Sequence, residues 1–297
     1  MKILISGATG LIGGYLVPHL QKCEHALTAL TRSKAELPHI KWNPATGAID
    51  PSQLEGFDAV IHLAGESIAG GRWTPAKKKR IVSSRHAGTR LLCETLASLR
   101  SKPDVLVSAS GIGYYGDRGD ETLTEASAVG NSFLSRVCTH WEESCESARK
   151  AGIRVVNLRQ GVILTKKGGA LQKMLLPFRA GAGGPIGDGK QYMSWIDIED
   201  IVKIYDFALT HSSLEGAVNA TAPHPVTNTD FVKTLGKAVH RPAVIPLPAF
   251  IVRLIFGELG EELLLAGANV LPNKLKRQGY HFAYDKLAPS LQHVLAQ

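Results

Sequence analysis

A stretch near the start of the chain reads SGATGLIGGYL and holds three evenly spaced glycines. Gly7, Gly10 and Gly13 form the motif G-x-x-G-x-x-G between an apolar run, residues 2–7, and a helical segment that begins near residue 11. Glycine allows a tight turn and lets backbone N–H groups approach a pyrophosphate, which then lies on the helix N-terminus. Because strand and helix flank the motif, we expect a dinucleotide-binding loop rather than a merely tight turn.

A second group of polar residues follows the next predicted strand, residues 26–32. Here the sequence reads TRSK, from Thr31 to Lys34. An acidic residue at this place would bind the ribose diol of NAD(H). Arg32 instead offers a planar fork of donors and Ser33 a hydroxyl, and both suit a 2′-phosphate. These residues favour NADP(H) as the cofactor, and the alternative is an exposed arginine on a loop.

The elements that must position these residues alternate along the first half of the chain. Short apolar runs predict strands, and longer amphipathic segments predict helices. The predicted strands span residues 2–7, 26–32, 58–65, 104–110 and 154–164, and the predicted helices span about 11–21, 75–99 and 131–150. This alternation predicts an α/β fold with a doubly wound parallel sheet of the Rossmann type.

The pattern changes after about residue 164. Glycines crowd residues 180–189, and helices are expected to begin near residues 198 and 227. A distinct C-terminal segment covers about residues 241–297. We therefore expect a dinucleotide-binding domain over residues 1–165 and a smaller α/β substrate lobe over residues 166–297, partly interwoven with the first.

Charge and cysteine usage argue against several classes of protein. The formal charge is +8, but the basic residues are scattered, and the KKKR run at residues 77–80 lies in a predicted helix. A solvated helix face is favoured over a nucleic-acid patch. The 4 cysteines form no C-x-x-C pair, so no metal site is predicted. No apolar run reaches membrane-spanning length. Free thiols and the lack of a leader predict a cytoplasmic protein.

Several longer motifs carry a resemblance to a known family. They are the glycine triplet and the segments HLAG at 62–65, AGTRLL at 87–92, YYGD at 114–117, LRQGVIL at 158–164 and GPIGDGKQYMSWIDIED at 184–200. With these motifs the chain resembles the extended short-chain dehydrogenase/reductase family of sugar-nucleotide epimerases and dehydratases, over nearly its whole length. The stretches GESIAGGRW, MLLPFRAGAGGPIG and IPLP…LPNKL are similar to a branch known as epimerase family proteins.

The resemblance implies cofactor contacts beyond the glycine loop. In the family, the segment that matches Leu63–Gly65 packs along the adenosine and ribose. The segment that matches Gly161 and Val162 approaches the nicotinamide. The expected cofactor-binding residues are Gly7, Thr9, Gly10, Leu11, Ile12, Gly13, Thr31, Arg32, Ser33, Leu63, Ala64, Gly65, Arg85, Ser108, Gly161 and Val162.

The proton-handling residues of the family are changed in this chain. The family's catalytic helix reads Y-x-x-x-K, and alignment on Glu142 places Leu134 at the tyrosine and Cys138 at the lysine. The family's catalytic Ser or Thr matches Gly111, and a further family asparagine matches Arg85. General acid–base catalysis contributes about 10²–10⁴ in rate. Hydride transfer would therefore be slow unless another residue substitutes.

Ser110 and Tyr115 are the predicted substitutes, because both follow the strand whose end should point towards the nicotinamide. Packing in a family turn explains Tyr115 equally well. Cys138 is a weaker candidate, since its helical spacing places it among core residues and a nucleophilic thiol needs a base. Arg85 either pairs with a cofactor phosphate or ribose, or forms a surface salt bridge.

Two functions are compatible with these residues. The first is an NADP(H)-dependent oxidoreductase or epimerase with a rearranged acid–base set, acting on a small molecule such as a nucleotide-linked one. The second is a catalytically silent NADP(H)-binding sensor. The family's assembly implies a homodimer through helices 75–99 and 131–150, with Leu134 and Trp141 on the contact face. In relatives the substrate cleft is lined by residues that match Arg159, Arg179, Lys190, Gln191, Tyr192 and Trp195.

Overall fold

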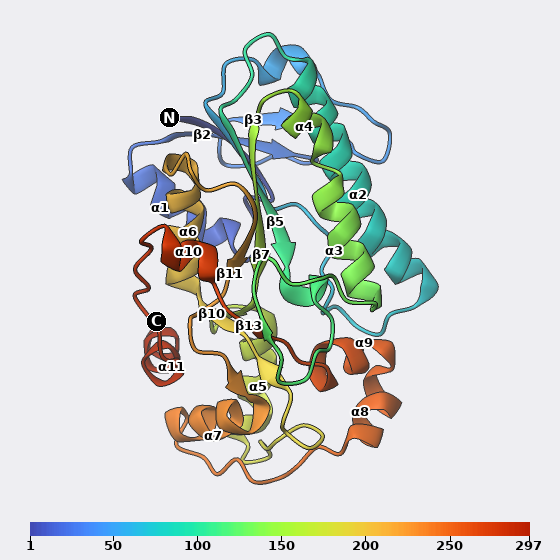
Figure 1. Cartoon of the computed structure of the whole chain (residues 1–297), viewed down its shortest axis with the longest axis vertical. Helices are drawn as coiled ribbons and strands as arrows, with labels where there is room; N and C mark the ends of the chain where they lie inside the picture. Colours follow the sequence, from blue (N-terminus) through green and yellow to red (C-terminus); the bar gives the residue numbers. More distant parts are fainter.

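The computed structural model describes the whole chain, residues 1–297. Its centre is a sheet of seven parallel strands in the order β11-β7-β5-β4-β1-β2-β3 (Figure 1). The strands are β1 (Lys2–Ser6), β2 (Ala26–Thr31), β3 (His39–Lys41), β4 (Ala59–His62), β5 (Val105–Gly111), β7 (Arg154–Gln160) and β11 (Gly216–Ala220). The chain runs from β1 towards one edge and then returns to β4 and the other edge. The predicted doubly wound α/β fold is confirmed.

Helices cover both faces of this sheet. On one side lie α2 (Pro75–Ser98), α3 (Phe133–Glu143) and α4 (Glu146–Lys150), and on the other lie α1 (Gly13–Lys22), α6 (Ile198–Thr210) and α10 (Asn273–Arg277) (Figure 1). Successive strand residues point to opposite faces. Ile3 and Ile5 accordingly enter the core that contains α1 and α6, whereas Leu4 enters the core that contains α2 and α4.

Most of the remaining elements form the lower part of the molecule in Figure 1. Its helices are α5 (Gly169–Arg179), α7 (Asn228–Ala238), α8 (Ala249–Phe256), α9 (Glu258–Gly260) and α11 (Leu287–Ala296). Three short strand pairs connect distant segments: β8 (Val162–Leu164) with β10 (Trp195–Asp197), β9 (Tyr192–Met193) with β12 (Val226–Thr227), and β6 (Thr122–Leu123) with β13 (Asn269–Val270). Since β11 returns to the main sheet, the two parts are interwoven, and the division at residue 165 stays a prediction.

Two predicted elements are divided in the structure. The predicted helix over residues 131–150 becomes α3 and α4, with a break at Ser144 and Cys145. The predicted strand over residues 154–164 becomes β7 and β8, with a break at Gly161. There the chain passes so close to Ser194 that a Cβ atom on Gly161 would lie 2.6 Å from the Ser194 carbonyl oxygen. The chain thus leaves the main sheet and pairs with β10.

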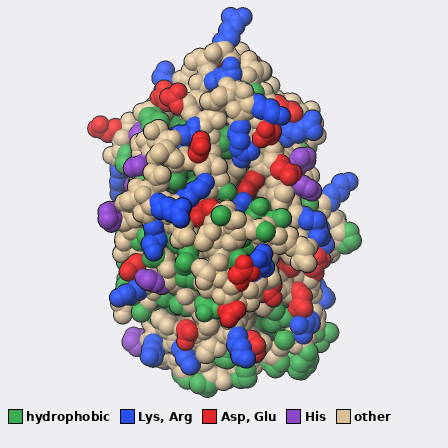
Figure 2. Space-filling model, in the orientation of Figure 1, with side chains coloured by type: hydrophobic (Ala, Val, Ile, Leu, Met, Phe, Trp, Pro, Cys, Tyr) green, Lys and Arg blue, Asp and Glu red, His purple; other side chains and the backbone are tan.

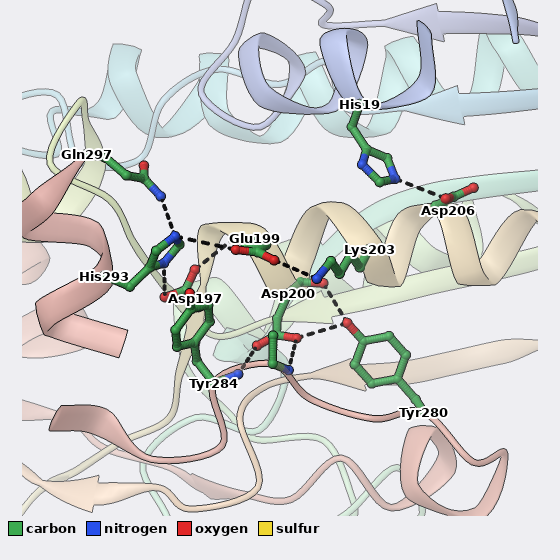
Figure 3. A network of polar contacts seen from close by, with 11 residues as sticks. His19, Asp197, Glu199, Asp200, Lys203, Asp206, Tyr280, Tyr284, His293 and Gln297 are labelled. Atoms are coloured by element: carbon green, nitrogen blue, oxygen red, sulfur yellow. Dashed lines mark hydrogen bonds and ion pairs between the residues drawn. The ribbon is translucent and has the colours of Figure 1, made fainter. Parts of the chain in front are cut away.

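Two buried carboxylates attach the C-terminal segment to α6 (Figure 3). Asp197 accepts a hydrogen bond from the Ser290 hydroxyl at 2.6 Å and contacts His293 at 3.2 Å. Asp200 accepts bonds from the backbone N–H groups of residues 283 and 284 and from the Tyr280 hydroxyl. Both carboxylates are fully buried. The acidic residues of the WIDIED motif therefore hold the end of the chain in place.

The surface in Figure 2 carries Lys and Arg side chains interspersed with Asp and Glu, and hydrophobic side chains gather at its lower end. None of the helices combines the length and the apolar character that crossing a membrane would need. The exposed hydrophobic side chains include Leu176, Val244, Ile245, Phe250, Leu254 and Ile255.

Candidate functional site

The glycine loop joins β1 to α1, and its backbone is too tightly packed for side chains at two of the three motif glycines. Gly7 has φ +74°, and a Cβ there would lie 2.9 Å from the Leu63 carbonyl carbon. A Cβ on Gly13 would lie 2.4 Å from the carbonyl oxygens of both Gly7 and Ala8. The close turn brings Gly7 next to Leu63 and Ala64, and Gly10 and Thr9 are exposed in front of α1. Such a loop at a helix N-terminus fits a pyrophosphate.

The other expected cofactor residues of this half lie around the loop. Leu11 and Ile12 are half-buried at the start of α1, and a Cβ on Gly168 would lie 2.6 Å from a methyl carbon of Leu11. At the end of β2, the Ser33 amide donates to the Thr31 hydroxyl at 3.3 Å, and Arg32 is exposed. Since the ends of β1 and β2 are adjacent in the sheet, Arg32 and the glycine loop lie at the same edge.

A buried histidine, His62, lies beneath the glycine loop and links the elements around it. His62, at the end of β4, contacts the Ser6 hydroxyl through Nδ1 at 2.6 Å and the Thr89 hydroxyl through Nε2 at 2.9 Å. All three side chains are fully buried. Burial lowers the pKa of His62 from 6.5 to about 4, so the ring is neutral at physiological pH. This contact chain ties β1, β4 and α2 together beneath the glycines.

The buried His62 predicts an acid-sensitive fold. Between pH 6.5 and about 4 the unfolded chain protonates this ring and the folded chain does not, so stability falls as pH falls. The full effect is about 3 kcal/mol at pH 4. In urea unfolding at a series of pH values, the wild type should lose this amount relative to His62→Gln across that window. Parallel pH profiles for the two proteins would contradict it.

Arg85 lies on α2 against Gly65, where the family has an asparagine. A Cβ on Gly65 would lie 3.3 Å from the Arg85 guanidinium carbon. The guanidinium donates to the Glu66 carbonyl at 2.9 Å and lies 4.8 Å from the Trp141 ring centre. Arg85 contacts carbonyl oxygens and an aromatic ring and no carboxylate. The alternative of a surface salt bridge, raised from the sequence, is therefore wrong. A largely buried cation in this state suits an anionic ligand.

The two positions of the family's tyrosine and lysine are buried and apolar on α3. A Cβ on Gly113 would lie 3.0 Å from the Leu134 Cβ, and one on Gly111 would lie 3.8 Å from the Cys138 sulfur. Burial, with Glu142 adding to it, raises the pKa of the Cys138 thiol to about 11. A neutral, buried thiol is a poor nucleophile. Leu134 and Trp141 are buried within one chain, so these two side chains do not form the contact face suggested for a dimer; the homodimer itself stays a prediction.

One turn beyond Cys138, α3 carries a charged residue, Glu142, which forms a buried polar cluster. The guanidinium of Arg159 donates to both carboxylate oxygens of Glu142 at 2.8 Å, and the Ser110 hydroxyl donates to Oε1 at 2.7 Å. The Arg159 and Glu142 side chains are only 5% and 12% exposed. Burial alone would lower the pKa of Arg159, but the bonds to Glu142 outweigh it and raise the pKa. This cluster is called the Ser110–Glu142–Arg159 triad below.

The sheet register and an aromatic neighbour position the triad. Ser110 on β5 and Arg159 on β7 are direct partners in the parallel ladder. The Arg159 guanidinium carbon lies 3.4 Å from the centre of the Tyr114 ring. Sequence reasoning assigned Arg159 to substrate binding and treated Glu142 only as an alignment anchor. The sequence does hold one sign of this pair: Arg159 stands inside an apolar parallel strand, and a charge buried there needs a partner of opposite charge.

Tyr115 does not face an open site. Its side chain is fully buried, its hydroxyl donates to Asn219 at 2.6 Å, and it accepts from Arg159 at 3.1 Å. Burial raises the pKa of the phenol, although Arg159 opposes this shift. With both bonding directions occupied, Tyr115 positions Arg159. The prediction of a direct proton donor at Tyr115 is therefore corrected.

The remaining expected residues divide between the site and the core. Gly161 and Val162 are half-buried where β7 ends, and the Val162 amide donates to the Ser194 carbonyl at 2.8 Å. Ser108 is fully buried inside β5, so the expected cofactor contact there is corrected to a core position. Trp195 is likewise buried and donates to the His224 carbonyl. Arg179 and Lys190 are exposed, and Gln191 and Tyr192 are half-buried.

The fold and the site together define a doubly wound α/β protein of the Rossmann type with a glycine-rich loop at its first crossover. Residues 3–220 match the NAD dependent epimerase/dehydratase family, and residues 247–294 match a domain of unknown function, DUF1731. The chain belongs to the NAD dependent epimerase/dehydratase family.

Individual relatives match the chain over nearly their whole length. An epimerase family protein of Mycobacterium tuberculosis is 39% identical over 98% of this chain and 97% of its own. The human epimerase family protein SDR39U1 is 36% identical over 100% of both chains. A crystal structure of human SDR39U1 with NADPH covers 100% of this chain and 99% of its own, with a TM-score of 0.90 and 33% identity.

A second solved structure extends the comparison. A nucleoside-diphosphate sugar epimerase from Corynebacterium glutamicum has a TM-score of 0.83 and 33% identity, and the match covers 99% of this chain and 58% of that one. The UDP-N-acetylglucosamine 4-epimerase of Bacillus cereus, at 17% identity and a TM-score of 0.78, shares the fold.

Proposed function

We propose that the chain is an NADP(H)-dependent oxidoreductase or epimerase of the cytoplasm, in which the Ser110–Glu142–Arg159 triad replaces the family's Tyr and Lys. The observation that carries the proposal is the triad itself, a hydroxyl bonded to a carboxylate one helical turn from Cys138. The substrate is a small molecule, and the similarity to a nucleoside-diphosphate sugar epimerase makes a nucleotide-linked compound the first candidate.

The glycine loop and Arg32 support NADP(H) as the cofactor. The loop leaves no room for side chains at Gly7 and Gly13, as a bound pyrophosphate requires. Arg32 is exposed at the end of β2, where a 2′-phosphate is read in this fold. The human relative at 33% identity was crystallised with NADPH. Leu63–Gly65, Arg85, Gly161 and Val162 are the proposed further contacts.

Cofactor choice gives a direct prediction. In Arg32→Ala we expect NADPH affinity to fall by about 10- to 100-fold, since a charged hydrogen bond contributes about 1.5–3 kcal/mol. NADH affinity should stay unchanged, because NADH lacks the 2′-phosphate. Fluorescence titration of both proteins with both nucleotides measures this difference. Equal affinity of the wild type for NADPH and NADH would refute the assignment.

When bound, the nicotinamide supplies or accepts the hydride, and the chain must handle the accompanying proton. The Ser110 hydroxyl donates to Glu142 and is 4% exposed, so its lone pairs can accept from a substrate hydroxyl only where the substrate reaches this end of β5. A proton leaving the substrate oxygen can pass through Ser110 to the Glu142 carboxylate. Arg159 orients that carboxylate, and the Arg85 cation provides positive charge near Cys138, where the family has its lysine.

The alternative is a silent NADP(H)-binding sensor, and the burial of Leu134 and Cys138 favours it. The two functions differ in turnover rather than in binding. The test is NADPH oxidation, and NADP⁺ reduction, against a panel of sugar nucleotides, ketones and alcohols, alongside a binding titration. Turnover that is slow with simple sugar nucleotides but saturable with another substrate supports the enzyme. Tight NADPH binding with no turnover across the panel supports the sensor.

A further inference from the structure

A mixed group of metal-binding side chains lies on the sheet face opposite the triad helix. His19 is on α1, Cys23 directly follows α1, and Asp206 is on α6. Figure 3 shows His19 and Asp206 pointing towards each other from these two helices. Their nearest atoms, His19 Nε2 and Asp206 Oδ2, are 3.0 Å apart. The Cys23 sulfur lies 3.9 Å from each of these two atoms.

These three atoms form a triangle of the size that a zinc ion needs. Zinc–ligand bonds of about 2.0–2.3 Å at tetrahedral angles place the ligand atoms about 3.4–3.6 Å apart. The observed separations of 3.0 and 3.9 Å lie on either side of that range. His19 and Asp206 are half-buried and Cys23 is exposed, so these side chains have room to rotate towards a shared ion.

A candidate fourth donor lies beside the Asp206 carboxylate, outside the three atoms that are within 4.8 Å of one another. His25 precedes β2, and its Nε2 lies 3.9 Å from Asp206 Oδ1, the other oxygen of the same carboxylate. Two imidazoles, a thiol and a carboxylate are the groups that bind zinc in proteins. His19 and Cys23 are four residues apart, so Cys23, the C-cap residue of α1, lies on the side of the helix that carries His19. A His–Asp pair alone is an ordinary surface contact, whereas these four groups together can bind a metal ion.

We propose that His19, Cys23 and Asp206, with His25 as the fourth donor, bind a zinc ion that joins α1 to α6. No metal site is expected from the sequence, because its cysteines do not pair and the carboxylate comes from a residue far along the chain. Packing of α1 against α6 brings the donors together. The ion links the helix that follows the glycine loop to the helix that holds the C-terminal segment.

The test is zinc binding by the full chain after treatment with a chelator. Equilibrium dialysis against ZnCl₂ should give a single zinc ion per chain at micromolar free zinc. Cobalt(II) should produce a thiolate-to-metal charge-transfer band, which requires a sulfur ligand. A hundredfold excess of zinc over its Kd should raise the Tm by roughly 5 °C, because the ion binds only the folded chain.

Variants identify the ligands. Cys23→Ala should lose both the cobalt band and the stoichiometric zinc, and Asp206→Asn should weaken zinc binding at least about tenfold. Circular dichroism checks that both variants are folded. His39→Ala, which removes an exposed histidine on β3, serves as the matched control and should keep the zinc. The proposal is overturned if the wild type shows no saturable zinc binding, or if Cys23→Ala binds zinc as tightly as the wild type. Neither outcome depends on NADPH.

Discussion

Gly13→Ala is expected to lower NADPH affinity at least about 100-fold, while Gly14→Ala leaves it intact. A methyl group on Gly13 would lie 2.4 Å from the carbonyl oxygens of Gly7 and Ala8, and both are backbone atoms that cannot rotate away. The loop must shift, at a strain of about 1–3 kcal/mol, and its N–H groups then no longer meet the pyrophosphate. Titration with NADPH measures the loss.

Gly14 is the matched control because no atom beyond its chain neighbours and its own helix backbone lies within 4 Å of its added Cβ. Alanine also favours a helix by about 1 kcal/mol over glycine. The Tm of Gly14→Ala should therefore stay the same or rise, and that of Gly13→Ala should fall. If the two variants bound NADPH equally well, the proposed cofactor site at this loop would be wrong.

Glu142→Gln is expected to lower kcat by about 10²–10³ and to change the NADPH Kd only slightly. The amide keeps the shape of the carboxylate but cannot take up a proton from Ser110, and such proton transfer contributes about 10²–10⁴ in rate. Ser110→Ala should lower kcat similarly, since it interrupts the same path. Rates are measured with the best substrate of the panel and normalised to folded protein.

The neighbouring Glu143 provides the control. It is exposed on the same helix, so Glu143→Gln should keep full activity and stability. Glu142→Gln also removes a charge from the buried pair with Arg159, and breaking such a pair costs about 3–5 kcal/mol. We therefore expect a lower Tm together with the lower kcat. Normal kcat in Glu142→Gln would exclude the triad as the proton-handling group and leave Cys138→Ser as the next variant to test.

The parts predicted well from the sequence are those that depend on local pattern. Gly7, Gly10 and Gly13 all lie in the seven residues, 7–13, that join β1 to the start of α1, so a short motif is enough to recognise the loop. Five of the seven parallel strands are recognisable as short apolar runs, whereas β3 and β11 are not among the five predicted strands. The resemblance of the long motifs to the family then identified the changed positions. Cys138 lies against Gly111 at the end of β5, and Leu134 lies against Gly113, just beyond it.

The parts that were missed depend on contacts between distant segments. Glu142 and Arg159 meet only because β5 and β7 are neighbours and α3 crosses their ends. Tyr115 follows the expected strand, but nothing in its local sequence tells that Asn219 and Arg159 enclose its hydroxyl. The break between β7 and β8 likewise depends on Ser194, more than thirty residues further along.

The position of β11 has a consequence for synthesis on the ribosome. This edge strand, residues 216–220, completes the main sheet, and the Asp200 carboxylate gains its partners only when residues 280–284 have emerged. The nascent chain can therefore form the β1–β7 portion early, but with an open β7 edge and before the C-terminal segment can cover Asp200. An exposed strand edge invites pairing with other chains. Translation speed across the last third of the message, and chaperone access during it, should thus influence how much of this protein reaches its native state.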